Sequence, residues 1–217
     1  MTQDQELWDS YNNLLLSSDT DRIKKLLARY EVFKRAMKVP GDIVECGVFK
    51  GAGFMYWLKL LKLFAFQEQR MVIGFDTFKS FSDSLLDYEK TSAQSFVNEA
   101  LFEGVDPKEI IDNAKSGGFL NSELIAGDVL ETIPKYKKEN PGFRISLLHL
   151  DLDTYQGTKI VLENFYDLVT PGGIILLDEY GKRGWGESDA VDEFLKNKNK
   201  IIHAIKDSYQ PTSFIVK

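Results

Sequence analysis

The sequence predicts an α/β fold built on an open, mostly parallel β-sheet with helices on both faces. Short apolar runs alternate with segments of helical periodicity along most of the chain. These runs show little polar alternation, as expected of strands buried on both faces. The chain has 217 residues, of which 43% are hydrophobic and 28% charged, so we expect one globular domain over residues 1–217.

The N-terminal region, residues 1–38, is expected to be helical. Lysines and arginines separate apolar residues that recur at helical spacing. These apolar residues are Ile23, Leu26, Leu27, Tyr30, Phe33 and Met37. Ser18 or Thr20 could cap this helix, and Pro40 with Gly41 would end it.

The first unit of the sheet is expected directly after this region. The pattern predicts a strand over 42–46, a glycine-containing turn over 47–53 and a helix over 54–66. A second strand is predicted over 71–75. Strand, helix and strand together form a parallel βαβ unit.

A long connection, residues 77–120, follows the second strand. It is too long for a plain loop in a compact domain, and we expect short helices over 92–102 and 107–115. Asp106 precedes Pro107, a favoured residue at the first helical position. We interpret 77–120 as an insertion that shapes a substrate pocket and acts as a lid.

The alternation resumes in the second half of the chain. Helices are predicted over 129–136, 157–168 and 190–195, and strands over 123–126, 144–150, 174–177, 201–205 and 213–216. Pro171, Gly172 and Gly173 are expected to form a turn before the 174–177 strand. The last two strands are too close for a helical crossover, which predicts an antiparallel hairpin at one edge of a seven-stranded sheet.

Five successive strands end in acidic residues, and ligands of such sheets bind beyond the carboxyl ends of the strands. These acids are Glu45, Asp76, Asp128, Asp151 with Asp153, and the pair Asp178 and Glu179. A single Asp after a strand is often only a helix cap or turn residue. Five along one edge predict a negative cleft that suits a cationic ligand, a metal ion or sugar hydroxyls.

The turn after the first strand carries Gly47, Gly51 and Gly53, which lets the backbone approach a ligand. It matches neither the G-x-G-x-x-G pattern nor the GK[ST] of a phosphate-binding loop. Asp76 follows Gly53 by 23 residues, close to the spacing of an acid that holds ribose hydroxyls. This spacing favours a cofactor that contains a nucleoside without identifying it.

Composition excludes other classes of protein. The net charge of −6 argues against a nucleic-acid partner, which normally requires a basic face. The most apolar stretch, residues 55–66, contains Lys59 and Lys62 and is too short to span a membrane. The acidic N-terminus does not resemble a secretory signal, and the lone Cys46 fits a reducing compartment, so we expect a cytoplasmic protein.

Several segments, in order, resemble the macrocin O-methyltransferase family. They are residues 29–35 (RYEVFKR), 39–51 (VPGDIVECGVFKG), 74–78 (GFDTF), 150–155 (LDLDTY), 171–173 (PGG), 178–181 (DEYG) and 190–194 (AVDEF). The resemblance implies a Rossmann-like class I methyltransferase fold. It also implies dependence on S-adenosylmethionine and on a divalent metal, usually Mg²⁺ or another hard cation.

The resemblance also implies roles for individual residues. By position, Glu45, Gly47 and Gly51 would border the methionine part of the cofactor. Asp76, with Thr77 beside it, would bind the ribose, and Asp128 would lie near the adenine. Asp151, Asp178 and Glu179 would hold the metal, although the family usually has two aspartates where this chain has Asp178 and Glu179.

We assign Asp151 as the metal ligand that could also act as catalytic base, because a hydroxyl must lose its proton to become a good nucleophile. For Asp153 we favour the cap of the helix that includes Gly157. We interpret His149 as a satisfied buried residue and place Trp185 at the mouth of a substrate pocket.

The leading hypothesis is an O-methyltransferase that acts on a hydroxyl of a small molecule, such as a sugar of a natural product. One alternative is an NAD-dependent oxidoreductase on a related fold, which Asp76 would also serve. Another is a non-catalytic nucleoside-binding protein, which the fold alone does not exclude. A homodimer is the base-rate expectation for oligomeric state.

Overall fold

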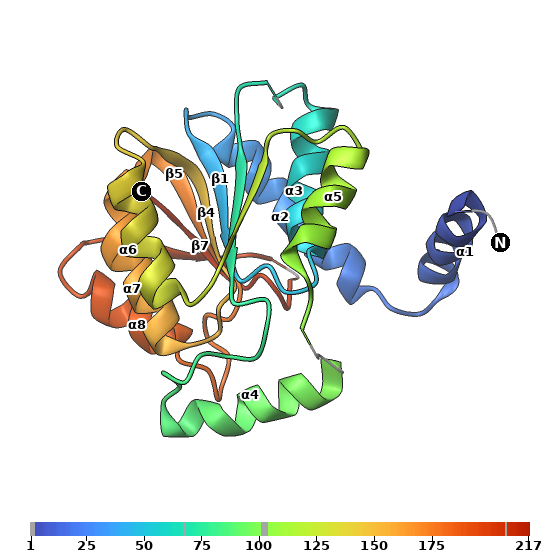
Figure 1. Ribbon diagram of the computed structural model, residues 1–217. Helices are drawn as coiled ribbons and strands as arrows, with labels where there is room; N and C mark the ends of the chain where they lie inside the picture. The colour runs from blue at the N-terminus through green and yellow to red at the C-terminus, as the bar shows by residue number, and fades with distance from the viewer. Residues whose placement is uncertain (1–2, 67, 101–103, 207) are drawn as a thin grey trace.

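The computed structural model describes residues 3–66, 68–100, 104–206 and 208–217, and it has a central seven-stranded sheet (Figure 1). The strand order is β3-β2-β1-β4-β5-β7-β6. The strands are β1 (Asp42–Cys46), β2 (Val72–Asp76), β3 (Ser122–Ala126), β4 (Ile145–Leu150), β5 (Val169–Leu177), β6 (Ile202–Ala204) and β7 (Ser213–Val216). Strands β1 to β5 pair in parallel, and β7 pairs antiparallel with β5 and β6. The predicted α/β sheet and its edge hairpin are therefore confirmed.

Helices cover both faces of the sheet. They are α1 (Gln3–Leu16), α2 (Asp21–Ala36), α3 (Ala52–Leu63), α4 (Asp87–Ala100), α5 (Pro107–Ser116), α6 (Val129–Glu139), α7 (Tyr155–Phe165) and α8 (Glu187–Leu195), with a short 3₁₀ turn at Tyr166–Leu168. Side chains of α2, α3 and α5, including Trp57, form the core on one face. Side chains of α6, α7 and α8, including Phe165, form the core on the other. In Figure 1, α1 stands apart from the body and α4 lies below the sheet.

The insertion contains the two expected helices, with a shifted boundary in the first. Helix α4 begins at Asp87, five residues before the predicted start, and Asp87 and Glu89 place negative charge in its first turn, where the helix dipole favours it. The predicted end at Phe102 lies outside the described residues. Helix α5 begins as predicted, because the Asp106 side chain accepts a hydrogen bond from Lys108 N.

Two predictions about turns and caps were wrong. Pro171, Gly172 and Gly173 belong to β5 rather than to a turn before it. Between Val169 and Ile174, β5 has more residues than the part of β4 that it faces, so a β-bulge interrupts the pairing of the two strands. Gly172 lies in this bulge and has a positive φ of 85°. The cap of α7 is Thr154, whose side chain accepts from Gly157 N, and not Asp153.

Gly47 brings the ends of β1 and β4 together. Its φ is 96°, and a Cβ built on it would lie 1.8 Å from the backbone oxygen of Asp151. The backbone N–H of Asp151 in turn donates to Cys46 O at 2.8 Å. This close approach places the residues at the ends of the two strands within reach of one another.

Among the residues that the structure describes, no helix combines the length and the apolar character needed to cross a membrane.

The Gly47→Ala substitution should destabilise the fold by about 3 kcal/mol or more, because the new Cβ collides with backbone that cannot rotate away. Gly142→Ala is the control, since Gly142 has a similar φ of 86° but nothing within 4 Å of its Cβ position. That control should lose only about 1–2 kcal/mol, the cost of a left-handed conformation. Urea unfolding measures both, and equal losses would contradict the role of the close approach.

Candidate functional site

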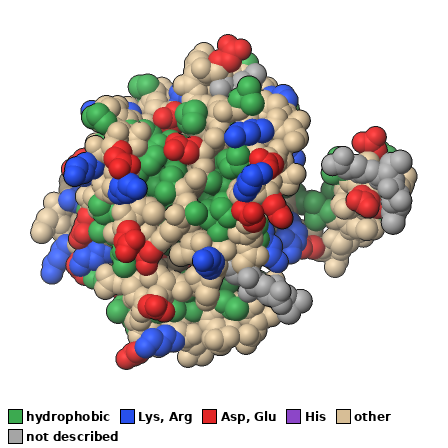
Figure 2. Space-filling view, viewed as in Figure 1, with side chains coloured by type: hydrophobic (Ala, Val, Ile, Leu, Met, Phe, Trp, Pro, Cys, Tyr) green, Lys and Arg blue, Asp and Glu red, His purple; other side chains and the backbone are tan. Residues whose placement is uncertain are grey.

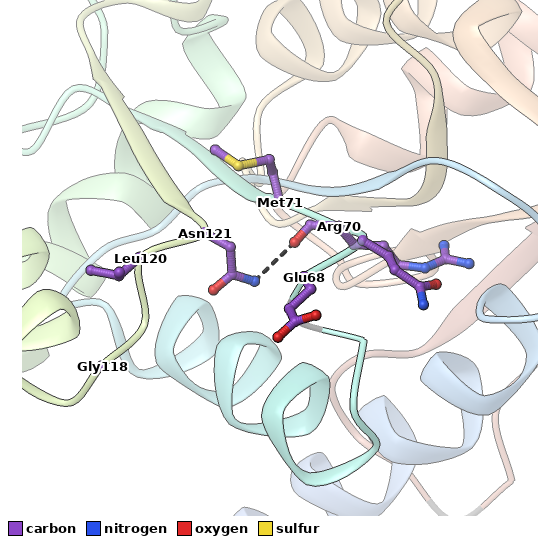
Figure 3. A pocket seen from close by; sticks show the side chains of 7 residues that line it. Glu68, Arg70, Met71, Gly118, Leu120 and Asn121 are labelled. Carbon is purple, nitrogen blue, oxygen red and sulfur yellow. Dashed lines mark hydrogen bonds between the residues drawn. The ribbon is translucent and has the colours of Figure 1, made fainter.

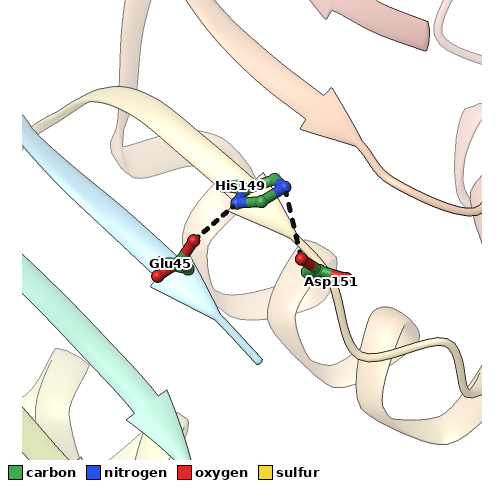
Figure 4. Close-up of side chains that lie close together, drawn as sticks. All are labelled: Glu45, His149 and Asp151. Atoms are coloured by element: carbon green, nitrogen blue, oxygen red, sulfur yellow. Dashed lines mark hydrogen bonds and ion pairs between the residues drawn. The ribbon is translucent and has the colours of Figure 1, made fainter. Parts of the chain in front are cut away.

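Acidic side chains gather where β1, β4 and β5 end. Glu45 lies in β1, Asp151 directly follows β4 and Asp178 directly follows β5. The strands are neighbours in the sheet. Figure 4 shows His149 of β4 between Glu45 and Asp151.

His149 links the acids of the three strands. Its ring is fully buried, with Nδ1 3.0 Å from Glu45 Oε1 and Nε2 3.2 Å from Asp178 Oδ1. Burial disfavours the charged ring, but the hydrogen bonds with Asp178 and Glu45 raise the pKa of His149 above its usual value. Since both partners are carboxylates, an imidazolium that donates from both nitrogens satisfies both contacts. The expectation of a satisfied buried histidine is confirmed.

Helix α2 supplies the fixed positive charge. The Arg29 side chain is only 6% exposed, and its Nη2 lies 3.2 Å from Asp151 Oδ2 and 3.9 Å from Asp178 Oδ1. Lys25 Nζ reaches Asp178 Oδ2 at 3.1 Å. Burial acts against the charged carboxylate, but His149, Lys25 and Arg29 hold the pKa of Asp178 below its usual range. Asp178 is therefore an ionised partner of the α2 cations.

Gly53 leaves the space that Arg29 occupies. A Cβ at Gly53 would lie 2.5 Å from Arg29 Nη1 and 2.4 Å from Glu45 Oε1. Trp57, one helical turn further along α3, donates from Nε1 to Glu45 Oε1 at 3.1 Å. The glycine-containing turn thus has a packing role at Gly53 as well as the ligand role predicted for Gly47 and Gly51.

A second group of acids lies on the other side of Asp151. Ligand atoms of Asp151, Asp153 and Glu179 lie within 4.8 Å of one another. Burial and then the charge of Asp178 raise the pKa of Asp151 to about 7. Burial, followed by the charges of Glu179 and Asp151, raises the pKa of Asp153 well above its usual value.

Among the described residues, Arg29 and His149 face Asp151 at 3.2 and 3.8 Å, and Lys182 faces Glu179. Lys182 Nζ lies 2.9 Å from Glu179 Oε2, and Gln210 Nε2 contacts Glu179 Oε1. Glu187 is also buried and accepts from Glu179 N at 3.0 Å, which adds another acid. A cluster of oxygen donors in which the acids outnumber the neighbouring cations fits a hard divalent cation.

The structure gives a different grouping from the predicted metal ligands. Asp151 and Glu179 come together as expected, with Asp153 as the third member. The carboxylate of Asp178 is engaged by Lys25 and His149 instead.

Asp76 holds the turn after β1. Its Oδ2 accepts from Val48 N at 2.7 Å and Phe49 N at 2.8 Å, and its Oδ1 accepts from Phe78 N at 2.7 Å. Thr77 Oγ1 lies 3.4 Å from the same Oδ1. Asp76 therefore contacts the backbone of the turn after β1 and the backbone of the turn after β2, in addition to the ribose contact predicted for it.

Gly51 and Asp128 both stand at helix starts. Gly51, with a φ of 86°, is the residue that precedes α3. Asp128 caps α6 by accepting from Leu130 N, and Ser82 of the insertion donates to its Oδ2. If Asp128 contacts the adenine as predicted, the adenine ring would lie next to the insertion.

The insertion is tied to the acidic site by Glu89 of α4. This glutamate is fully buried, and its Oε1 accepts from Tyr155 N at 2.6 Å while its Oε2 accepts from Leu86 N at 2.7 Å. Tyr155 begins α7, directly after the loop that holds Asp151 and Asp153. Phe81 contacts Trp185, with ring centroids 5.7 Å apart, so the insertion also contacts the residue predicted at the pocket mouth.

A cavity of about 480 Å³ lies elsewhere, at the amino ends of β2 and β3 (Figure 3). It is lined in part by Arg70, Met71 and Asn121, and Asn121 Nδ2 donates to Arg70 O at 2.9 Å. Since it opens at the opposite end of the strands from the acids, it is separate from the candidate site.

The sequence analysis does not identify the cations of α2, or two buried acids, Glu89 and Glu187, as parts of the site. Arg29 and Lys25 fall among the basic residues that separate the apolar positions of the N-terminal helix, and Glu89 and Glu187 match no predicted motif. Arg29 was present in a segment that resembled the family, which was the one available signal for its importance. The contacts of Glu89 depend on the three-dimensional packing of the insertion, for which the sequence carries no pattern.

Comparison with protein families identifies one match over most of the chain. The model of the macrocin-O-methyltransferase (TylF) family matches residues 19–212. Among curated proteins, the chain is 28% identical over 149 residues to mycinamicin III 3''-O-methyltransferase of Micromonospora griseorubida, covering 65% of this chain and 56% of that protein. It is 26% identical over 145 residues to a tetracenomycin rhamnosyl 4'-O-methyltransferase of Streptomyces olivaceus, covering 65% and 54%.

The chain thus spans about half the length of the curated relatives it matches. Among solved structures, it is similar to CalS11, a calicheamicin methyltransferase, with a TM-score of 0.81 and 29% identity. That match covers 95% of this chain and 83% of the other. The class I methyltransferase fold is therefore confirmed.

Arg29→Met should destabilise the protein by about 3 kcal/mol, because it leaves Asp151 and Asp178 buried without their partner. Arg22→Met is the control on the same helix. The Arg22 side chain is 78% exposed in its pair with Asp19, so its loss should change stability by less than about 0.5 kcal/mol. Denaturant unfolding compares the two, and similar small losses would show that Arg29 does not stabilise the site.

Proposed function

The chain belongs to the macrocin-O-methyltransferase family, and we propose that it transfers a methyl group from S-adenosylmethionine to a hydroxyl of a small molecule. The observation that carries this proposal is the group of Asp151, Asp153 and Glu179 at the strand ends, next to the glycine turn after β1. Such an arrangement puts oxygen ligands beside the place where a class I fold binds its cofactor. For the acceptor we propose a sugar of a natural product, the substrate class named for the matched relatives.

The cofactor would lie along the carboxyl ends of β1 and β2. In this proposal Glu45, Gly47 and Gly51 border the methionine part, Asp76 and Thr77 the ribose, and Asp128 the adenine. Support comes from the position of the turn that holds Gly47 and Gly51, which directly follows β1 at the edge where ligands of such sheets bind. The reaction forms an O–CH₃ bond and breaks the S–CH₃ bond, which leaves S-adenosylhomocysteine and a methyl ether.

We propose that Asp151, Asp153 and Glu179 hold a Mg²⁺ ion, in place of the set with Asp178. When bound, such an ion makes a substrate hydroxyl more acidic and helps to orient it. Arg29 fixes Asp151 through Oδ2, which leaves Oδ1 to face ligands or to accept the hydroxyl proton. His149 and Arg29 keep Asp178 ionised and so hold the end of β5 next to Asp151.

Four further parts of the proposal concern the whole protein. Residues 1–217 act as one methyltransferase domain, and the insertion over 77–120 acts as a lid anchored at Glu89. The protein works in the cytoplasm. It forms a homodimer, for which a specific interface is argued below.

The cofactor identity has a direct test in calorimetry. The protein should bind S-adenosylhomocysteine and not NAD. Asp76→Asn should weaken that binding at least tenfold through loss of a charge-assisted contact to the ribose, about 1.5–3 kcal/mol. Asp87→Asn is the matched control, because the Asp87 side chain is 98% exposed, and it should bind normally.

Unfolding of the free Asp76→Asn protein separates a weakened ribose contact from a disordered turn, since Asp76 also binds three backbone N–H groups. Binding of NAD without S-adenosylhomocysteine would instead favour the oxidoreductase. A stable variant with unchanged affinity would remove Asp76 from the cofactor site.

The metal site can be tested without activity by titrating Mn²⁺ and following its electron paramagnetic resonance. Asp153→Asn and Glu179→Gln should each weaken binding at least tenfold, because each removes one charged ligand. Glu163→Gln, on the exposed surface of α7, should have no effect. Loss of binding in Asp178→Asn, with retention in Asp153→Asn, would restore the ligand set expected from the sequence.

A further inference from the structure

Helix α1 displays an apolar face that no described residue of its own chain covers. Leu7, Trp8, Tyr11 and Leu15 are each at least half exposed and recur at helical spacing. Trp8 and Tyr11 stack on each other, with ring centroids 5.9 Å apart. A helix of 14 residues is marginal in water by itself, so this face requires a partner surface.

A groove of about 410 Å³ lies along α2 on the body of the molecule. Leu27, Ala28 and Val32 of α2 line one side of it, and Ile205 and Phe214 line the other. Leu27 is 57% exposed there, whereas Ala28, Val32 and Phe214 are buried. The groove therefore has the character of a binding site for an amphipathic helix.

The charges of the helix and the groove are complementary. Helix α1 carries Asp4, Glu6 and Asp9 and no basic residue. The groove is bordered by three basic side chains and a single acidic one, namely Lys24, Arg35, Lys206 and Glu31. Figure 2 shows α1 as a separate lobe with acidic side chains on its surface.

The connection between α1 and α2 directs α1 away from the groove of its own chain. Asp19 Oδ1 accepts from Asp21 N and Arg22 N, and Ser17 N donates to Asn13 O, so the short linker is itself ordered. In Figure 1 the helix projects outward from the end of α2. Folding back onto its own α2 would require the linker between these hydrogen bonds to change its conformation.

We propose that α1 of each chain seats in the α2 groove of a second copy, so that two chains form a dimer by reciprocal exchange of their N-terminal helices. The apolar face of α1 contacts the exposed Leu27 and the partly exposed Ile205 of the other copy, and its acids face the basic rim. A reciprocal arrangement closes as a two-fold dimer and leaves no unpaired seat.

Sedimentation velocity of the full chain tests this interface. The wild-type protein should be a dimer that weakens with added salt, because part of the contact is electrostatic. Leu7→Gln combined with Tyr11→Gln on α1, and Leu27→Glu in the groove, should each weaken dimerisation by about a hundredfold. Leu63→Glu is the matched control, since Leu63 is 75% exposed at the end of α3 and should leave the dimer intact.

Crosslinking then distinguishes a second copy from the same chain. A Tyr11→Cys copy mixed with a Leu27→Cys copy should give a crosslinked heterodimer with a short thiol-reactive linker, whereas Leu63→Cys in place of Leu27→Cys should not. Cys46 is buried and does not compete. A monomeric wild-type protein, or crosslinks only within a chain that carries both cysteines, would overturn the proposal. Failure of the protein to transfer methyl groups would not contradict the proposed dimer, because the two measurements are of mass and of crosslinking.

Discussion

The structure depends on how it compensates buried negative charge at the ends of three parallel strands. Glu45, Asp151 and Asp178 converge because β1, β4 and β5 are neighbours, and carboxylates so close repel one another in a medium of low polarity. His149 and the Arg29 guanidinium neutralise this group from within, and Lys25 does so from its rim. Helix α2 is therefore part of the site, although it precedes the first strand.

The fold was largely predictable because its signals are local. Apolar runs fix the strands, and the short link between the last two fixes the hairpin, since no helix fits in it. Errors occurred where tertiary contacts override local preference. Pro171, Gly172 and Gly173 carry every signal of a turn, yet the β4 pairing on either side of them holds the segment in β5 as a bulge. Similarly, Thr154 displaces Asp153 as the cap of α7.

The site was predictable as a location and less so as an arrangement. Acids at strand ends indicate the edge where ligands bind, but the sequence does not reveal which oxygen faces which neighbour. Asp178 and Glu179 are adjacent in the chain, yet one faces the cations of α2 and the other faces Asp153 and Lys182. Neighbouring residues at the end of a strand point to opposite sides, and this divides the acids into two groups.

The anchoring of the insertion by Glu89 has a consequence for how such proteins can diversify. A segment that shapes an acceptor pocket would ordinarily be free to vary in length and sequence. Here the same segment also supplies a buried acceptor to the first N–H of α7, directly behind the loop of Asp151 and Asp153. A chimera that exchanges this insertion between relatives must therefore carry a glutamate at the equivalent of Glu89, or the exchange will also disrupt the loop that holds Asp151 and Asp153.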